Sequence, residues 1–202
     1  SDVVFYTTGD RLWKTDGTAA GTSELTPAPN PFTERLETLF ALDGLLLFMG
    51  QTFASGTELW RSDGSAAGTR LVKEIGPGPV GGFEPLGVAG ERVRLGIGGV
   101  ANPLLFFAAD DAISGVELWR SDGSEDGTVL VKDIAPGPAG SFPLWFTEVD
   151  GLAVFSACDA AGCELWRSHG TEAGTRRVAH VEPARMGSNP RAFTLLGSDV
   201  IF

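Results

Sequence analysis

Aspartates recur at one position of a repeated Asp-Gly sequence, where a carboxylate could bind a hard cation such as calcium. They are Asp16, Asp63 and Asp122, and the fourth copy has His169 instead. A calcium loop of the EF-hand type needs acidic groups at alternate positions, because the ion takes several oxygen ligands at once. Each copy here supplies one carboxylate followed by glycine. We therefore predict an Asx turn, in which the aspartate accepts nearby backbone N–H groups, and no metal or other cofactor.

Tryptophan also recurs once per copy, and an exposed aromatic ring on each copy could stack on a sugar. These residues are Trp13, Trp60, Trp119 and Trp166, each between a leucine and a lysine or arginine in a predicted strand. A large side chain in the middle of a strand favours packing in the core, so we interpret these four as structural. Trp145 lies outside the repeated sequence and is the better candidate for binding a ligand.

The sequence offers little for nucleophilic catalysis. Its only histidines are His169 and His180, and no serine or cysteine stands at a spacing that suggests a base and an orienting group. A pair of non-repeated carboxylates of the kind that glycosidases use would be the other route to catalysis. The candidates for such a pair are Asp110, Asp111, Glu148 and Asp159. A carbohydrate-active hydrolase or lyase is therefore the enzymatic alternative.

The chain has two cysteines, Cys158 and Cys163. They are expected at the two ends of a hairpin loop, where their Cβ atoms can come within the roughly 4 Å that a disulfide needs. We predict this disulfide, with two free buried thiols as the alternative. A disulfide implies an oxidising compartment, so we expect a secreted or cell-surface protein, extracellular or periplasmic.

All these residues are set in a sequence that occurs four times. The copies are Arg11–Thr22, Glu58–Thr69, Glu117–Thr128 and Glu164–Thr175. Their tryptophans are 47, 59 and 47 residues apart, so the third repeat carries an insertion of 12 residues, which we place at 91–103 between two strands. Arg92 and Arg94 add positive charge there and are candidate contacts for an anionic partner. The alternative is an extended hairpin that packs on its own sheet.

The repeated sequence resembles the ELWxxDGT repeat, a bacterial repeat found in multi-copy, largely exported proteins. The match is carried by Glu58-Leu-Trp-Arg-Ser-Asp-Gly, Glu117-Leu-Trp-Arg-Ser-Asp-Gly and Glu164-Leu-Trp-Arg-Ser-His-Gly. The resemblance implies a propeller-like, extracellular repeat protein of no settled activity. The sequence departs from the motif at Arg11, Ser65, Ser124 and His169.

The elements that carry the motif read as short antiparallel strands. Asp150-Gly151 is the two-residue signal for a type I′ hairpin, and apolar runs flank it on both sides. Four such strands in a repeat of about 47 residues have the size of a propeller blade. We therefore predict an all-β chain, a β-propeller of four-stranded antiparallel blades. Calling the strands A to D from centre to rim, each Asp-Gly hairpin joins A to B.

We expect residues 1–202 to form a single propeller domain. Its repeats lie at about 1–42, 43–90, 91–149 and 150–197, with a partial fifth at 198–202. Because the chain opens at a B strand and ends in an A strand with the start of another B strand, both termini would complete the last blade and remove an open sheet edge. A longer array with more blades is the alternative.

Charge and hydropathy limit the partners. The net charge of −11 argues against duplex nucleic acid and anionic membrane surfaces, which bind clustered lysine and arginine. The chain has no apolar run long enough to cross a bilayer, so we expect no membrane insertion. The favoured function is a non-enzymatic extracellular or cell-surface module that binds or scaffolds a protein or glycan partner through loops at one end. A purely structural part of a larger assembly, with further blades or copies of itself, is the remaining alternative.

Overall fold

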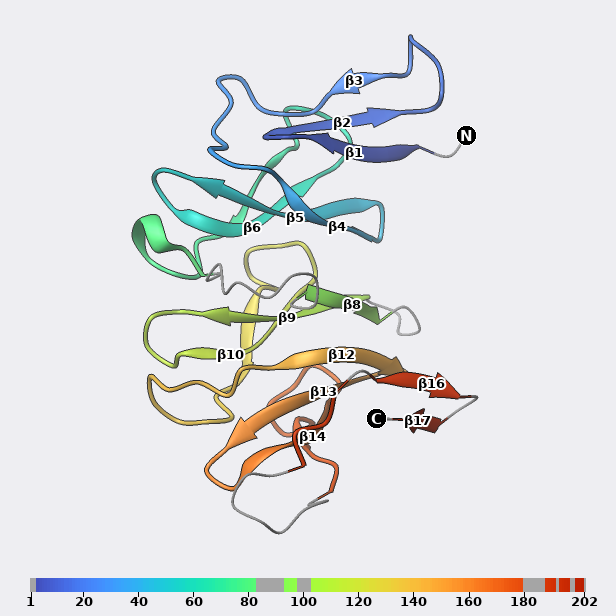
Figure 1. Ribbon diagram of the computed structural model, residues 1–202. Helices are drawn as coiled ribbons and strands as arrows, with labels where there is room; N and C mark the ends of the chain where they lie inside the picture. Colours follow the sequence, from blue (N-terminus) through green and yellow to red (C-terminus); the bar gives the residue numbers. More distant parts are fainter. Residues whose placement is uncertain are drawn as a thin grey trace. The chain divides into compact units, whose positions relative to one another are not determined.

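The computed structural model describes residues 3–82, 93–97, 103–179, 188–191, 193–196 and 199–201. The described part is all-β: antiparallel strands form every sheet, and the one helical element is a 3-10 turn, η1 (Gly78–Val80) (Figure 1). The predicted fold class is thus confirmed at this level. The chain divides into two compact units, Ser1–Glu84 with Gly123–Glu125 and Pro85–Asp122 with Asp126–Phe202.

The first unit holds two sheets. The strands of the first sheet, in order, are β1 (Val4–Thr8), β2 (Arg11–Thr15) and β3 (Ser23–Glu24). Those of the second sheet are β4 (Glu37–Leu42), β5 (Leu45–Thr52), β6 (Gly56–Ser62) and β7 (Arg70–Lys73). Strand order follows chain order in both, so each sheet is a simple antiparallel meander.

The second unit holds two further meanders and a hairpin. The third sheet consists of β8 (Val93–Ile97), β9 (Leu104–Asp110), β10 (Val116–Ser121) and β11 (Val129–Lys132). The fourth consists of β12 (Leu144–Val149), β13 (Leu152–Asp159), β14 (Gly162–Ser168) and β15 (Arg176–Arg177). The hairpin pairs β16 (Thr194–Leu196) with β17 (Asp199–Ile201), so the terminal strands β1 and β17 belong to different sheets.

The four-stranded sheets correspond strand by strand to the predicted A, B, C and D positions. In the second and fourth sheets a two-residue turn joins A to B, and both residues of the Asp150-Gly151 turn have positive φ, 49° and 75°, as a type I′ hairpin requires. In the first sheet Tyr6 lies opposite Trp13, as Phe48 lies opposite Trp60 in the second. The first sheet therefore begins at position B and has no A strand among its described strands.

The core of each sheet is built from the apolar runs of its B and C strands. In the second sheet Phe48 and Trp60 are buried, and the ring of Phe32 packs edge-on against both. In the fourth sheet Phe155 and Trp166 take the same positions and are equally buried. Burying one such aromatic side chain contributes about 1.5–3 kcal/mol, which makes the B–C pair the main stabilising element of each sheet.

The insertion in the third repeat does not lie where the sequence analysis places it. Residues 93–97, inside the expected insertion, form strand A itself, because β8 pairs with β9 as β12 pairs with β13. The extra length falls on both sides of β8: 19 residues separate β7 from β8 where 11 separate β11 from β12, and six separate β8 from β9 where two separate β12 from β13. The placement at 91–103 failed because the length between two motifs does not show which of its residues form the repeated strand.

Candidate functional site

The motif aspartates close their own turns. Thr18 donates its backbone N–H and its hydroxyl to Asp16 Oδ1, at 2.9 and 2.7 Å. Ser65 makes the same two bonds to Asp63 Oδ1, at 2.9 and 2.7 Å. These hydrogen bonds hold the pKa of both carboxyls below the usual value. In the described part of the chain, no three His, Cys, Asp or Glu side chains lie close enough to hold a metal ion.

The same turns explain the second glycine of the motif. A Cβ atom on Gly21 would overlap the Asp16 carboxylate, and one on Gly68 would overlap that of Asp63. In the fourth copy, a Cβ on Gly174 would overlap the His169 ring. The side chain at the aspartate position folds over this glycine, so the two positions constrain one another.

The glutamate that begins the motif is a functional element that sequence reasoning missed. Glu58, Glu117 and Glu164 are all fully buried. Glu58 Oε1 accepts the backbone N–H groups of Gly76 and Gly82, each at 2.9 Å, from the loop that follows the D strand. The sequence shows a glutamate before Leu-Trp in three copies, but it does not show that this glutamate is buried or that it fixes the loop after the D strand.

The other two glutamates hold the equivalent loops. Glu117 accepts the N–H groups of Ile134 and Ala135 at 3.0 Å each, and the hydroxyl of Ser141 at 2.5 Å. Glu164 accepts the hydroxyl of Ser188 at 2.6 Å. Each glutamate thus ties the segment that follows a D strand to the first residues of a C strand.

Burial sets the protonation behaviour of these glutamates. Removal from water raises the pKa of Glu58 to about 7, while the backbone N–H groups that it accepts act in the opposite direction and are the smaller effect. Burial also raises the pKa of Glu117. This carboxyl, half protonated near neutral pH, anchors the loop through the N–H groups of Gly76 and Gly82.

The repeated tryptophans lie in the sheets. Trp60, Trp119 and Trp166 are 8%, 6% and 6% exposed, and so present almost no ring surface to a ligand. Trp13 is half-buried, and its Nε1 donates to Thr8 Oγ1 at 3.0 Å.

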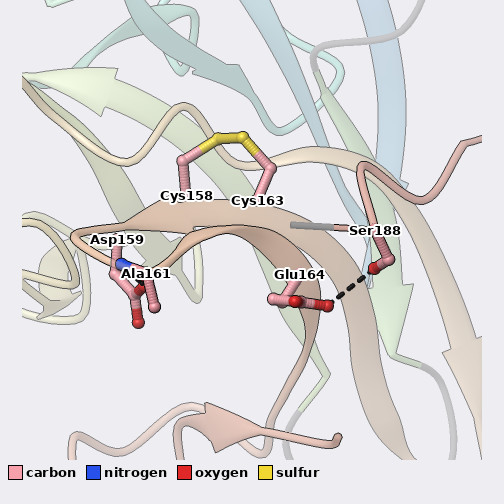
Figure 2. The surroundings of a disulfide bond; sticks show 6 residues. All are labelled: Cys158, Asp159, Ala161, Cys163, Glu164 and Ser188. Atoms are coloured by element: carbon pink, nitrogen blue, oxygen red, sulfur yellow. Dashed lines mark hydrogen bonds between the residues drawn. A yellow bond between two sulfur atoms is a disulfide. The ribbon is translucent and has the colours of Figure 1, made fainter. Parts of the chain in front are cut away.

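The predicted disulfide is confirmed. Cys158 and Cys163 face each other at the end of the β13–β14 hairpin and are bonded through their sulfurs (Figure 2). The equivalent cross-strand pairs are Gln51 with Thr57 and Asp110 with Val116. In Figure 2 the disulfide projects from one side of the hairpin and Glu164 from the other, toward Ser188. A disulfide is typical of proteins that fold in an oxidising compartment.

The loops that connect B to C and D to the next A lie at one end of each meander, which we call the Pro-Gly end. It carries Pro77-Gly78-Pro79 in the first unit and Pro136-Gly137-Pro138 in the second. In the second unit these loops are in contact: Ser141 and Phe142 both donate their N–H groups to Val116 O, at 2.9 and 3.0 Å. The Pro-Gly end is therefore a defined surface in each unit, held by the buried glutamates.

Large apolar side chains are exposed at this end. Ile113, in the B-to-C loop, is 77% exposed, and Phe142, in the D-to-A loop, is 43% exposed. Phe53 occupies the B-to-C loop of the second sheet in the first unit and is 88% exposed. These residues do not stand out in the sequence, because an apolar residue in a strand-rich sequence gives no sign of its exposure.

Trp145 stands at a bulge near the same end of the second unit. The register of β12 with β13 shifts between Leu144 and Thr147, and Trp145 has a φ of +60°, which is uncommon for a bulky residue. The bulge lets the next residue, Phe146, stack on Phe155 in the core while Trp145 stays half-buried. A β-bulge changes the direction in which a side chain points. Trp145 therefore stays a candidate binding residue, as the sequence indicates.

Two predicted contact residues are not placed. Arg92 lies outside the described residues, and of Arg94 only the backbone is described, in β8. In β8 the register with β9 shifts between Val93 and Gly96, so Arg94 lies at this irregularity.

Comparison with known proteins gives a fold and no family. No family model matches the chain, and no curated protein matches it. Among solved structures, the chain is similar to a mutant puromycin hydrolase complexed with PGG, at 17% identity and a TM-score of 0.53, over 87% of this chain and 28% of that one. It is also similar to the computationally designed protein Ika8, at 11% identity and a TM-score of 0.48, over 98% of this chain and 51% of that one. The chain thus spans about a quarter of the puromycin hydrolase chain and about half of the designed chain. At these identities the similarity concerns the fold alone.

Proposed function

We propose that this chain is a non-enzymatic, extracellular or cell-surface repeat module that binds a protein or glycan partner through its Pro-Gly end. In this proposal the sheets are blades of a β-propeller of the ELWxxDGT type. The repeated A-to-D meanders, the sequence motif and the disulfide support this assignment.

The observation that carries the proposal is the exposure of Ile113 and Phe142 on neighbouring loops of the second unit. Exposed apolar side chains that are grouped on a rigid surface mark sites of interaction. An isoleucine cannot stack on a sugar ring as an aromatic residue does, so this pair favours a protein partner. Trp145 at its bulge is the residue that suits a glycan.

Three of the four non-repeated carboxylates, Asp110, Asp111 and Asp159, support a binding role over hydrolysis. Asp111 Oδ1 accepts the N–H groups of Ile113 and Ser114, at 2.9 and 2.7 Å. Asp110 and Asp159 likewise each accept one N–H group from their own loops. These side chains shape the loops that present the apolar residues.

The proposal is tested by binding of the fluorescently labelled chain to intact cells of the organism that produces it, with a glycan array measured in parallel. We expect saturable binding to the cells that the I113S/F142S variant loses by at least tenfold. The matched control is V178S, which removes a 49% exposed side chain beside β15, at the sheet edge opposite β12. Equal loss in the control, or saturable turnover of a glycan bound on the array, would count against the proposal.

A further inference from the structure

The chain has six Asp-Gly pairs, and they lie in two kinds of turn. Four belong to the motif turns that join C to D, and the other two, Asp43-Gly44 and Asp150-Gly151, are the two-residue turns that join A to B. An Asp-Gly pair is chemically reactive, because glycine has no Cβ to hinder the approach of its own main-chain nitrogen to the side chain before it. The two kinds of turn differ in whether the reacting groups are held by hydrogen bonds.

The reaction is a ring closure followed by hydrolysis. The glycine nitrogen bonds to the carboxyl carbon of the aspartate, and the carboxyl hydroxyl leaves with the amide proton as one water molecule. Water then opens the five-membered ring at either of its two carbonyls. One product is aspartate again, and the other is isoaspartate, whose main chain runs through the side-chain carbon.

In the first motif turn both reacting groups are engaged. The Gly17 N–H donates to Thr15 Oγ1 at 3.0 Å, which holds the attacking nitrogen. Asp16 Oδ1 accepts the N–H and the hydroxyl of Thr18, which holds the carboxyl. Ring closure at this pair first requires these bonds to break.

The second motif turn has the same arrangement. The Gly64 N–H donates to Ser62 Oγ at 3.2 Å, and Asp63 Oδ1 accepts the N–H and the hydroxyl of Ser65. These hydrogen bonds also lower the pKa of the carboxyls of Asp16 and Asp63. The protonated carboxyl, from which the hydroxyl leaves most readily, is therefore less populated in the motif turns.

The A-to-B turns leave the same groups open. Asp43, Gly44 and Asp150 are exposed, and Gly151 is half-buried. Within the residues that the structure describes, neither carboxyl and neither glycine N–H of these two turns has a hydrogen-bonding partner. No atom lies within 4 Å of a Cβ added to Gly44 or Gly151, so water reaches both turns.

We propose that Asp43-Gly44 and Asp150-Gly151 are sites of spontaneous conversion to isoaspartate, and that the hydrogen bonds of the motif protect the pairs at 16 and 63 from it. The modification uses only the chain and water, and it is independent of the proposed binding function. Its structural effect is local: isoaspartate adds one main-chain carbon to a turn whose length sets the register of two strands. In the fourth sheet that turn directly follows the Val149–Leu152 pair of β12 and β13, and β12 carries Trp145.

The test is incubation of the purified, disulfide-bonded chain near neutral pH in water enriched in the heavy isotope of oxygen. Each passage through the ring adds one heavy oxygen to the resulting aspartate or isoaspartate, and peptide mass spectrometry locates it. We expect label at Asp43 and Asp150 to accumulate at least about tenfold faster than at Asp16 and Asp63, because each reacting group of the motif sites must first lose a hydrogen bond. An isoaspartyl methyltransferase should methylate the peptides that contain positions 43 and 150.

Two controls separate hydrogen bonding from the neighbouring sequence. In the reduced chain unfolded in guanidinium, all four positions should label at similar rates. In the folded chain, S65A removes the hydroxyl that donates to Asp63, and S65T restores one with the residue found at this position of the first copy. We expect label at Asp63 to accumulate at least about threefold faster in S65A than in S65T.

Three results would overturn the proposal. The first is equal labelling of the four positions in the folded chain, and the second is a difference between them that persists after unfolding. The third is labelling of Asp63 that is no faster in S65A than in S65T, which would show that the motif hydrogen bonds give no protection.

Discussion

At the scale of single residues, the buried glutamate of the motif controls how stability depends on pH. The folded state raises the pKa of Glu58 from its usual 4.5 to about 7, so between these values the folded chain holds a proton that the unfolded chain releases. Stability therefore falls as pH rises from 4.5 to 7, by up to about 3 kcal/mol for this one group. Urea unfolding midpoints at pH 5 and pH 7.5 measure this difference.

The E58Q variant separates charge from anchoring. Glutamine keeps an oxygen that can accept the N–H groups of Gly76 and Gly82, and it does not titrate, so we expect the variant to lose most of this decline and to match or exceed wild-type stability at pH 7.5. E58A leaves both N–H groups without an acceptor and should cost about 2–4 kcal/mol at pH 5, and less at pH 7.5, because it too lacks the titrating group. A pH profile for E58Q that is the same as wild type would show that another group is responsible.

The Asp-Gly turn makes a second prediction at this scale. G68A should destabilise the chain by about 1–3 kcal/mol, because the new Cβ overlaps the Asp63 carboxylate. In the D63A/G68A double variant the overlap is gone, so the two changes should cost less together than the sum of each alone. The measurement is a double-mutant cycle of unfolding free energies, and strict additivity would contradict the geometry.

At the scale of elements, the disulfide closes a hairpin that is already paired. Replacing Cys158 and Cys163 by serine should lower the free energy of unfolding by about 2 kcal/mol, because the closed loop is short and the entropy that it removes from the unfolded chain is small. Partner binding should survive, since Ile113 and Phe142 lie on other loops. Guanidinium titrations of the wild-type and double-serine chains measure the difference; a loss of more than about 5 kcal/mol would mean that the bridge holds more than its own hairpin.

The elements also show which features can be predicted from sequence. The Asp-Gly turns and the Cys158–Cys163 pairing depend on local chemistry, namely a positive φ at adjacent residues and the register of one hairpin, and both were predictable. Strand A of the third sheet was not, because the length between motifs does not show how extra residues divide between two loops. The hydrogen-bonding partners of Glu58 were not predictable either, because they belong to a loop about 20 residues further along the chain.

At the scale of the whole molecule, the polar residues of the repeated motif serve the structure of the repeats themselves. Aspartate closes the turn, glutamate fixes the Pro-Gly loop, and the basic residue reaches the next repeat. The residues that differ between repeats have no such structural role and can contact a partner. Those described at the Pro-Gly end include the exposed Ile113, Phe142 and Phe53. Repetition supplies a rigid support, and the variable loops carry the specificity.

Site-specific photo-crosslinking tests that division of roles most directly. A photoreactive phenylalanine analogue is placed at 113, 142 or 178 in three separate chains, and each chain is irradiated on intact cells of the producing organism. As the proposed function requires, we expect positions 113 and 142 to label the same protein and position 178, beside the outer strand of the fourth sheet, not to label it. Labelling from position 178 alone, or equal labelling from all three positions, would contradict it.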